Sequence, residues 1–157
     1  MCVCRTPDGV LIDDFYVLEY NDWVNAVVVT KNQEIVLVQQ YRYSADDFFL
    51  EIPAGKAEEG ESMEEAIVRE VKEETGYISD LPPIWLGSYF VNPATQTNRI
   101  HIYLLKEARK EYDQQLDPAE WIDIKVMPIP ALEALLGAGK IKHLFTASAF
   151  QMAKEYI

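Results

Sequence analysis

The chain has 157 residues, 49% of them hydrophobic, with a formal net charge of −12 at pH 7 and an isoelectric point near 4.5. This length and apolar content are typical of a globular domain and exclude a disordered chain. The acidic charge excludes a general affinity for nucleic acids or for anionic membrane surfaces. No apolar stretch approaches the length needed to cross a bilayer, and the first residues lack the pattern of a signal peptide. Because the chain has only Cys2 and Cys4, we expect neither a disulfide framework nor a zinc site, and a cytoplasmic location.

The N-terminal part of the chain is expected to form a turn and strands. Residues 6–9, Thr-Pro-Asp-Gly, have the composition of a turn, and residues 15–20 that of a short edge strand. We therefore expect residues 1–22 to be an N-terminal extension or edge strands of a single domain that spans residues 1–157. Apolar and β-branched residues then fill two segments, which predicts strands over 23–30 and 35–41.

A helix is expected in the middle of the chain. Ser62 and Glu65 have the spacing of a capping box, which predicts a helix that begins near Met63, and Gly76 can supply the left-handed residue that ends it. Around it, we expect strands over 48–52, 84–91, 100–105 and 121–126 and helices over 130–137 and 146–156. This alternation predicts an α/β domain with a mixed sheet covered by helices.

Three carboxylates in this helix have the spacing of a metal site. Glu70, Glu73 and Glu74 stand at positions i, i+3 and i+4, so they share one face of the helix. Acidic side chains this close repel one another unless a cation lies between them. Ligands with oxygen atoms only suit a hard divalent ion such as Mg²⁺ or Mn²⁺, which binds phosphate oxygens and activates water. Most runs of glutamate on a helix only form a solvated face. The prediction of a metal site therefore depends on the spacing of these three residues and not on their number.

The segment 55–77 resembles the Nudix box, G-x5-E-x7-R-E-U-x-E-E-x-G-U, in which U is a bulky aliphatic residue. Every fixed position is met, by Gly55, Glu61, Arg69, Glu70, Glu73, Glu74 and Gly76. Tyr77, at the last position, is aromatic instead of aliphatic. The resemblance implies a Nudix-type α/β/α sandwich with a mixed β-sheet, in which Glu61 and Arg69 tie the box loop to its helix. It also implies hydrolysis of a nucleoside diphosphate that is linked to another moiety.

Segments outside the box resemble one subgroup of this family, the ADP-ribose and nucleoside-diphosphate-sugar pyrophosphatases. The similar segments are Gln39–Tyr43, Glu51–Gly55 and Asn98–Leu105, together with Pro93, sixteen residues after the box. Ala94 and Thr97 depart from the subgroup pattern, which leaves the sugar open. Two other functions stay open: a hydrolase of nucleoside triphosphates or dinucleoside polyphosphates, and a nucleotide-sensing module without catalysis.

The resemblance assigns the metal ligands and the catalytic acids. Glu70 and Glu74 are the first candidates for binding Mg²⁺, with Mn²⁺ as the alternative ion. Glu73 is the third candidate and the Ala54 carbonyl is the fourth. Glu120, in a late acidic loop, is a candidate metal ligand or general base, or else simply part of a solvated loop.

The remaining site residues are expected to bind the substrate, a small nucleoside-diphosphate derivative. Arg42 is a candidate clamp for a phosphate, because a guanidinium matches phosphate geometry. Glu51 is a candidate for orienting a water, and Pro93 marks the substrate loop. Trp23 is a candidate for stacking on adenine, although core packing is the commoner role for a single aromatic residue. In related dimers the N-terminal strands contribute to the neighbouring site, so we expect a homodimer.

Overall fold

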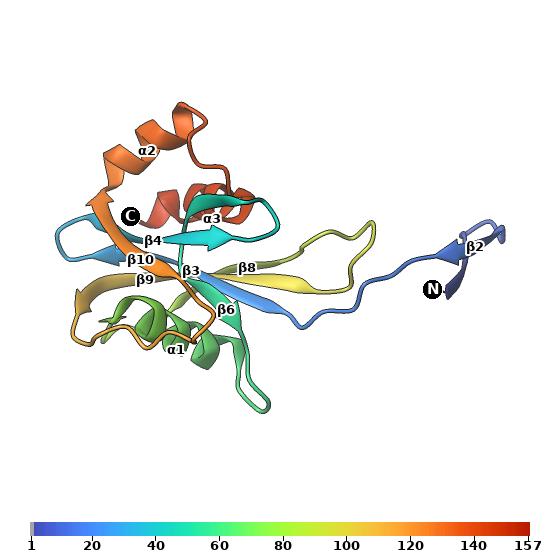
Figure 1. Cartoon of the computed structure of the whole chain (residues 1–157), viewed down its shortest axis with the longest axis horizontal. Helices are drawn as coiled ribbons and strands as arrows, with labels where there is room; N and C mark the ends of the chain where they lie inside the picture. Colours follow the sequence, from blue (N-terminus) through green and yellow to red (C-terminus); the bar gives the residue numbers. More distant parts are fainter. Residues whose placement is uncertain (1) are drawn as a thin grey trace.

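The computed structural model describes residues 2–157, in which an eight-stranded mixed sheet has helices on both faces (Figure 1). The strands are β1 Cys2–Arg5, β2 Leu11–Phe15, β3 Trp23–Thr30, β4 Glu34–Arg42, β5 Asp47–Glu51, β6 Ala54–Lys56, β7 Tyr77–Ile78, β8 Ile84–Phe90, β9 Arg99–Lys110 and β10 Ile122–Pro128. The helices are α1 Met63–Thr75, α2 Ile129–Gly137 and α3 Leu144–Ala153, followed by a 3₁₀ turn, Lys154–Tyr156. None of the helices in residues 2–157 combines the length and apolar character that crossing a membrane requires.

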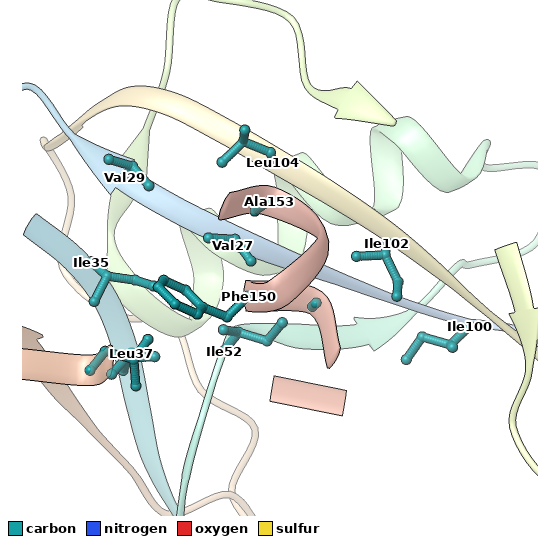
Figure 2. Close-up of a cluster of buried hydrophobic side chains, with 12 residues drawn as sticks. Val27, Val29, Ile35, Leu37, Ile52, Ile100, Ile102, Leu104, Phe150 and Ala153 are labelled. Carbon is teal, nitrogen blue, oxygen red and sulfur yellow. The ribbon is translucent and has the colours of Figure 1, made fainter. Parts of the chain in front are cut away.

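The sheet is mixed because its central strand β3 pairs with β9 in parallel and with β4 and β6 in antiparallel orientation. Side chains alternate between the two faces of β3, so one strand supplies two hydrophobic cores. Val27 and Val29 lie under α2 and α3, whereas Val24 and Val28 lie under α1. Figure 2 shows the first core, where the ring of Phe150 reaches from α3 toward β4. The expected α/β/α sandwich is thereby confirmed.

The N-terminal residues differ from the prediction. The strand expected over 15–20 is wrong: β1 and β2 form a separate two-stranded sheet, and of residues 16–20 only Leu18 makes a β-bridge, with Gln96. This small sheet stands at the end of an extended segment, away from the main sheet (Figure 1). It therefore cannot contribute to the hydrophobic core of its own chain.

Helix α1 has the two ends that its sequence indicates. Ser62 accepts a hydrogen bond from the backbone N–H of Glu65, whose side chain in turn accepts one from the Ser62 N–H, which is the expected capping box. At the other end Gly76 takes the left-handed conformation, with φ 71°, and its N–H donates to the Lys72 carbonyl. The two caps therefore define where α1 begins and ends.

Substituting Gly76 by alanine is expected to lower the free energy of unfolding by roughly 1–3 kcal/mol, the usual cost of a strained backbone position. The new Cβ would lie 1.9 Å from the Tyr112 carbonyl oxygen, so steric overlap adds to the backbone strain. Urea denaturation measures the change. Gly60→Ala is the matched control, because Gly60 also has a positive φ, 83°, but no atom lies within 4 Å of its Cβ position. Equal losses in the two variants would contradict the role of this contact.

Candidate active site

Two box carboxylates accept hydrogen bonds from the backbone of β6. Ala54 donates its N–H to Oε2 of Glu74 at 3.0 Å, and Lys56 donates its N–H to Oε1 of Glu70 at 3.3 Å. A Cβ atom on Gly55 would lie 2.0 Å from the carboxyl carbon of Glu70. Glycine is therefore required here, because the strand approaches the carboxylate too closely for any side chain.

Glu74 is a buried acid beside other acids. Glu74 is only 5% exposed, and burial raises the pKa of its carboxyl group to about 8. The negative charges of Glu70 and Glu120 raise this pKa further, while the Ala54 N–H and the positive charge of Arg42 lower it. Burial also raises the pKa of Glu70. Within residues 2–157, no lysine, arginine or histidine forms a salt bridge with Glu74. A buried, uncompensated acid in this setting is typical of a cation site.

Arg69 holds the loop before α1 against the helix. Its Nε and Nη2 atoms each donate to an oxygen of Glu61 at 2.9 Å, and Nη2 also donates to the Lys56 carbonyl at 2.9 Å. Its Nη1 donates to Glu70 and to Glu73, both at 3.0 Å. Arg69 thus connects the loop, the helix and two of the three predicted acids. Glu73 lies at the more exposed edge of this network, with 36% of its side chain accessible.

The donors around β6 fit a hard divalent ion. In residues 2–157, no three acidic, histidine or cysteine side chains converge as a ready metal site. Glu70 and Glu74 nevertheless both accept hydrogen bonds from the backbone of the same short strand, and Glu74 has no ion-pair partner in residues 2–157. Carboxylate and carbonyl oxygens are the ligands that Mg²⁺ prefers. The residues that fit this ion are therefore Glu70, Glu74 and the Ala54 carbonyl, with Glu73 farther out.

A pocket of about 430 Å³ lies beside the two acids, and Ala54 and Gly55 form part of its wall. Trp23 and Phe145 form an aromatic wall, in an edge-to-face contact with ring centroids 5.9 Å apart. Arg42 and Lys56 line the same pocket and supply its positive charge. The dimensions suit a small ligand. A larger hollow of about 600 Å³ lies on the outer side of α1 and is lined by neither of the two acids.

Arg42 is fixed by a buried acid. Its Nε and Nη2 atoms donate to the two oxygens of Glu51 at 2.8 and 2.6 Å, and this pair raises the pKa of the Arg42 guanidinium. Glu51 is only 1% exposed, whereas 42% of the Arg42 side chain is accessible. His143 completes the group, with Nδ1 3.4 Å from Glu51 and a pKa that burial lowers. The guanidinium is thus held in place with an open side, as binding of a phosphate requires.

The other predicted residues lie farther from this centre. Glu120 is exposed and accepts a hydrogen bond from the Asp117 N–H, yet its charge reaches both Glu74 and Arg42. Pro93 is exposed in the loop between β8 and β9 and does not line the pocket. The structure therefore brings Trp23 to the centre and leaves Pro93 outside it.

Sequence reasoning missed five residues that line the pocket: Asn25, Lys56, Ile100, His143 and Phe145. The signal for Asn25 was present, because it is the only amide in a run of apolar residues from Trp23 to Val29. His143 gave no such signal. It lies far along the chain from Arg42 and Glu51 and meets them only through folding.

Comparison with known proteins identifies the family. Residues 20–147 match the family model described as NUDIX domain. The chain is 37% identical to a methanol dehydrogenase activator of Bacillus methanolicus over 64% of this chain and 55% of the activator. It is 29% identical to an ADP-ribose pyrophosphatase of Bacillus subtilis over 82% of this chain and 69% of that enzyme.

A solved structure described as an ADP compounds hydrolase superposes with a TM-score of 0.84, at 21% sequence identity, over 98% of this chain and 82% of that one. At this identity the likeness supports the fold alone. The match to the activator spans about half of that protein's length. The family model, by contrast, covers most of the chain and includes the two acids, Gly55 and Arg42. The chain therefore belongs to the NUDIX domain family.

Proposed function

We propose that the protein is a Mg²⁺-dependent hydrolase that cleaves the pyrophosphate bond of ADP-ribose or of a related nucleoside-diphosphate sugar. The products would be a nucleoside monophosphate and a sugar phosphate. The observation that carries the proposal is the arrangement of Glu70 and Glu74 around β6, beside a pocket with the fixed guanidinium of Arg42. The similarity to a named ADP-ribose pyrophosphatase supports this choice of substrate.

In this proposal the chain's own residues bind and orient the pyrophosphate. Glu70, Glu74 and the Ala54 carbonyl would hold Mg²⁺, or Mn²⁺ in its place. The bound ion would neutralise phosphate charge and lower the pKa of a water. Arg42 donates to a phosphate oxygen, and Glu51 holds the guanidinium in the required orientation.

Three further residues have proposed roles around this centre. Glu120 is the candidate that accepts the proton of the attacking water, because it is an exposed carboxylate in the loop that leads into β10. Glu73 stays a reserve metal ligand, held by Arg69. Trp23 provides a flat apolar surface for a ring of the substrate at the pocket wall.

We also propose a cytoplasmic homodimer. The β1–β2 sheet extends from the body of its own chain and exposes Val10, Leu11 and Ile12, each at least 40% accessible. A second copy of the chain is the simplest cover for such an apolar arm. The charge of −12 gives no support to nucleic-acid or membrane partners, which leaves a small molecule as the ligand.

A substrate panel tests the proposed reaction. The protein is incubated with ADP-ribose, ADP-glucose, GDP-mannose, diadenosine polyphosphates and nucleoside triphosphates, with Mg²⁺ or with EDTA, and the products are separated by chromatography. We expect AMP and ribose 5-phosphate, released fastest from ADP-ribose and only with the metal. Faster hydrolysis of a nucleoside triphosphate or a dinucleoside polyphosphate would contradict ADP-ribose as the substrate. Binding without turnover of any compound would favour a sensor.

A further inference from the structure

The pocket beside Ala54 contains a buried amide without a partner. Asn25, on β3, has no exposed area. Among the residues that the structure describes, neither its Oδ1 nor its Nδ2 has a hydrogen-bond partner. Buried polar atoms are nearly always paired, and leaving both ends of an amide unpaired destabilises a protein. An unpaired amide at a pocket therefore points to a ligand.

Stability alone favours an apolar residue at this position. Asn25 stands between Val24 and Ala26, and all three are completely buried. Its side chain lies on the face of β3 that packs under α3, where Val27 and Val29 belong to the hydrophobic core. A leucine of similar size would leave no polar atom unpaired. The amide thus needs an explanation other than packing.

The cross-strand neighbour of Asn25 is Ala54, whose carbonyl is one of the proposed ligands of the ion that binds the pyrophosphate. Asn25 lies directly opposite Ala54 in the antiparallel β3–β6 pair. Such partners have their Cβ atoms about 5 Å apart on the same face of the sheet. Ala54 also contacts Glu74 through its N–H. Asn25 is therefore placed to contact the group bonded to a phosphate bound there.

The chemistry of the amide selects that group. Phosphate oxygens only accept hydrogen bonds, so a phosphate would pair Nδ2 and leave Oδ1 unpaired. Two neighbouring hydroxyls can accept from Nδ2 and donate to Oδ1 at the same time. A ribosyl group carries such hydroxyls and is bonded directly to the pyrophosphate in a nucleoside-diphosphate derivative. Ile100 and Trp23 line the pocket and offer apolar surface for the sugar ring.

We propose that the pocket is a ribosyl subsite in which Asn25 binds the vicinal hydroxyls of a ribose next to the pyrophosphate. This inference rests on the proposed function and names the substrate group that the pocket selects. Because Asn25 has no exposed area, binding requires one pocket side chain to turn aside. Trp23, two residues earlier on the same face, is partly buried, and its Nε1 has no partner in residues 2–157.

Calorimetry of small ligands tests the subsite without any need for turnover. The ligand pairs are AMP with 2′-deoxy-AMP, and ribose 5-phosphate with 2-deoxyribose 5-phosphate, each measured with Mg²⁺ present. The wild-type protein should bind the ribosyl member of one pair about 10-fold more tightly, the scale of a ribose hydroxyl hydrogen bond. The pair that discriminates shows which ribose of the substrate occupies the pocket.

Asn25→Leu should abolish this preference while leaving the urea midpoint unchanged or raised, because two unpaired polar atoms are removed. Asn98→Leu is the matched control: Asn98 is also a buried amide with both polar atoms unpaired in residues 2–157, but it does not line the pocket. The control should keep the ribosyl preference. A stability loss in Asn25→Leu with the preference retained would overturn the proposal, as would no preference, or no binding, in wild type.

These outcomes are separate from those of the substrate panel. A ribosyl preference without turnover would preserve the subsite and overturn the proposed hydrolysis. Turnover of ADP-ribose without a ribosyl preference in either pair would preserve the hydrolysis and overturn the subsite.

Discussion

Glu74→Gln is expected to lower kcat/KM for ADP-ribose by roughly 10³-fold, the scale for losing a group that organises charge in a transition state. Glutamine keeps the size of the side chain but removes the negative charge that would hold Mg²⁺. Steady-state kinetics with Mg²⁺ measures the loss. Glu64→Gln is the control, because Glu64 is an exposed acid in the first turn of the same helix. Equal activity in wild type and Glu74→Gln would contradict the assignment.

The pH dependence of the free energy of unfolding distinguishes this loss of activity from unfolding of the variant. Burial raises the pKa of Glu74 from an ordinary value of 4.5 to about 8, so the folded protein holds this proton more tightly than the unfolded chain. The stabilisation is fully present below the lower pKa and disappears as the pH rises through the higher one. In EDTA the wild type should therefore lose up to ~1.4 kcal/mol per pH unit within this window through this group. Glu74→Gln should lack this part of the slope and, near pH 8, be the more stable protein.

Gly55→Ala is expected to lower kcat/KM by roughly 100-fold, the effect of a misplacement of about 1 Å at a catalytic centre. The added Cβ would lie 2.0 Å from the Glu70 carboxyl carbon and 2.1 and 2.5 Å from its oxygens, so the carboxylate or the strand must move. The measurement is activity together with the urea midpoint. Gly137→Ala, with no atom within 4 Å of the new Cβ, is the control.

A double variant identifies the cause of the Gly55 effect. Gly55→Ala combined with Glu70→Ala removes the carboxylate with which the new Cβ overlaps. We expect the double variant to recover any stability lost in Gly55→Ala but not its activity, because the proposed metal ligand Glu70 is absent. If Gly55→Ala keeps full activity, the close approach of β6 to Glu70 has no part in the reaction.

Local sequence predicted the elements whose ends are set by local chemistry. The capping box and Gly76 determine α1, and the run of buried apolar residues determines β3 over Trp23–Thr30. The two-residue strand β7 and the three-residue strand β6 escaped prediction, because they exist only through pairing with β9 and β3. The expected strand over 15–20 has suitable residues but lacks a partner strand for most of its length.

The site was predictable to a similar extent. The box spacing identified Glu70 and Glu74, which are one helical turn apart and reach the same short strand. The pairing of Arg42 with Glu51 depends on the β4–β5 hairpin, so the sequence indicated both residues without their contact. Asn25 shows the remaining difficulty. A polar residue in an apolar strand is visible in the sequence, but whether it has a partner depends on the three-dimensional surroundings.

Hydrolysis of ADP-ribose in ¹⁸O-labelled water tests the central claim most directly. The protein is incubated with Mg²⁺, and the masses of the products are measured by mass spectrometry. Two parallel reactions contain EDTA in place of Mg²⁺, or the Glu74→Gln variant in place of wild type. The arrangement of Glu70, Glu74 and Arg42 predicts AMP and ribose 5-phosphate, with one ¹⁸O atom on the phosphate of one of them. It predicts no products with EDTA and product formation roughly 10³-fold slower with Glu74→Gln. Intact ADP-ribose with Mg²⁺, or the same labelled products from Glu74→Gln at the wild-type rate, would contradict a metal-dependent attack on the pyrophosphate at this site.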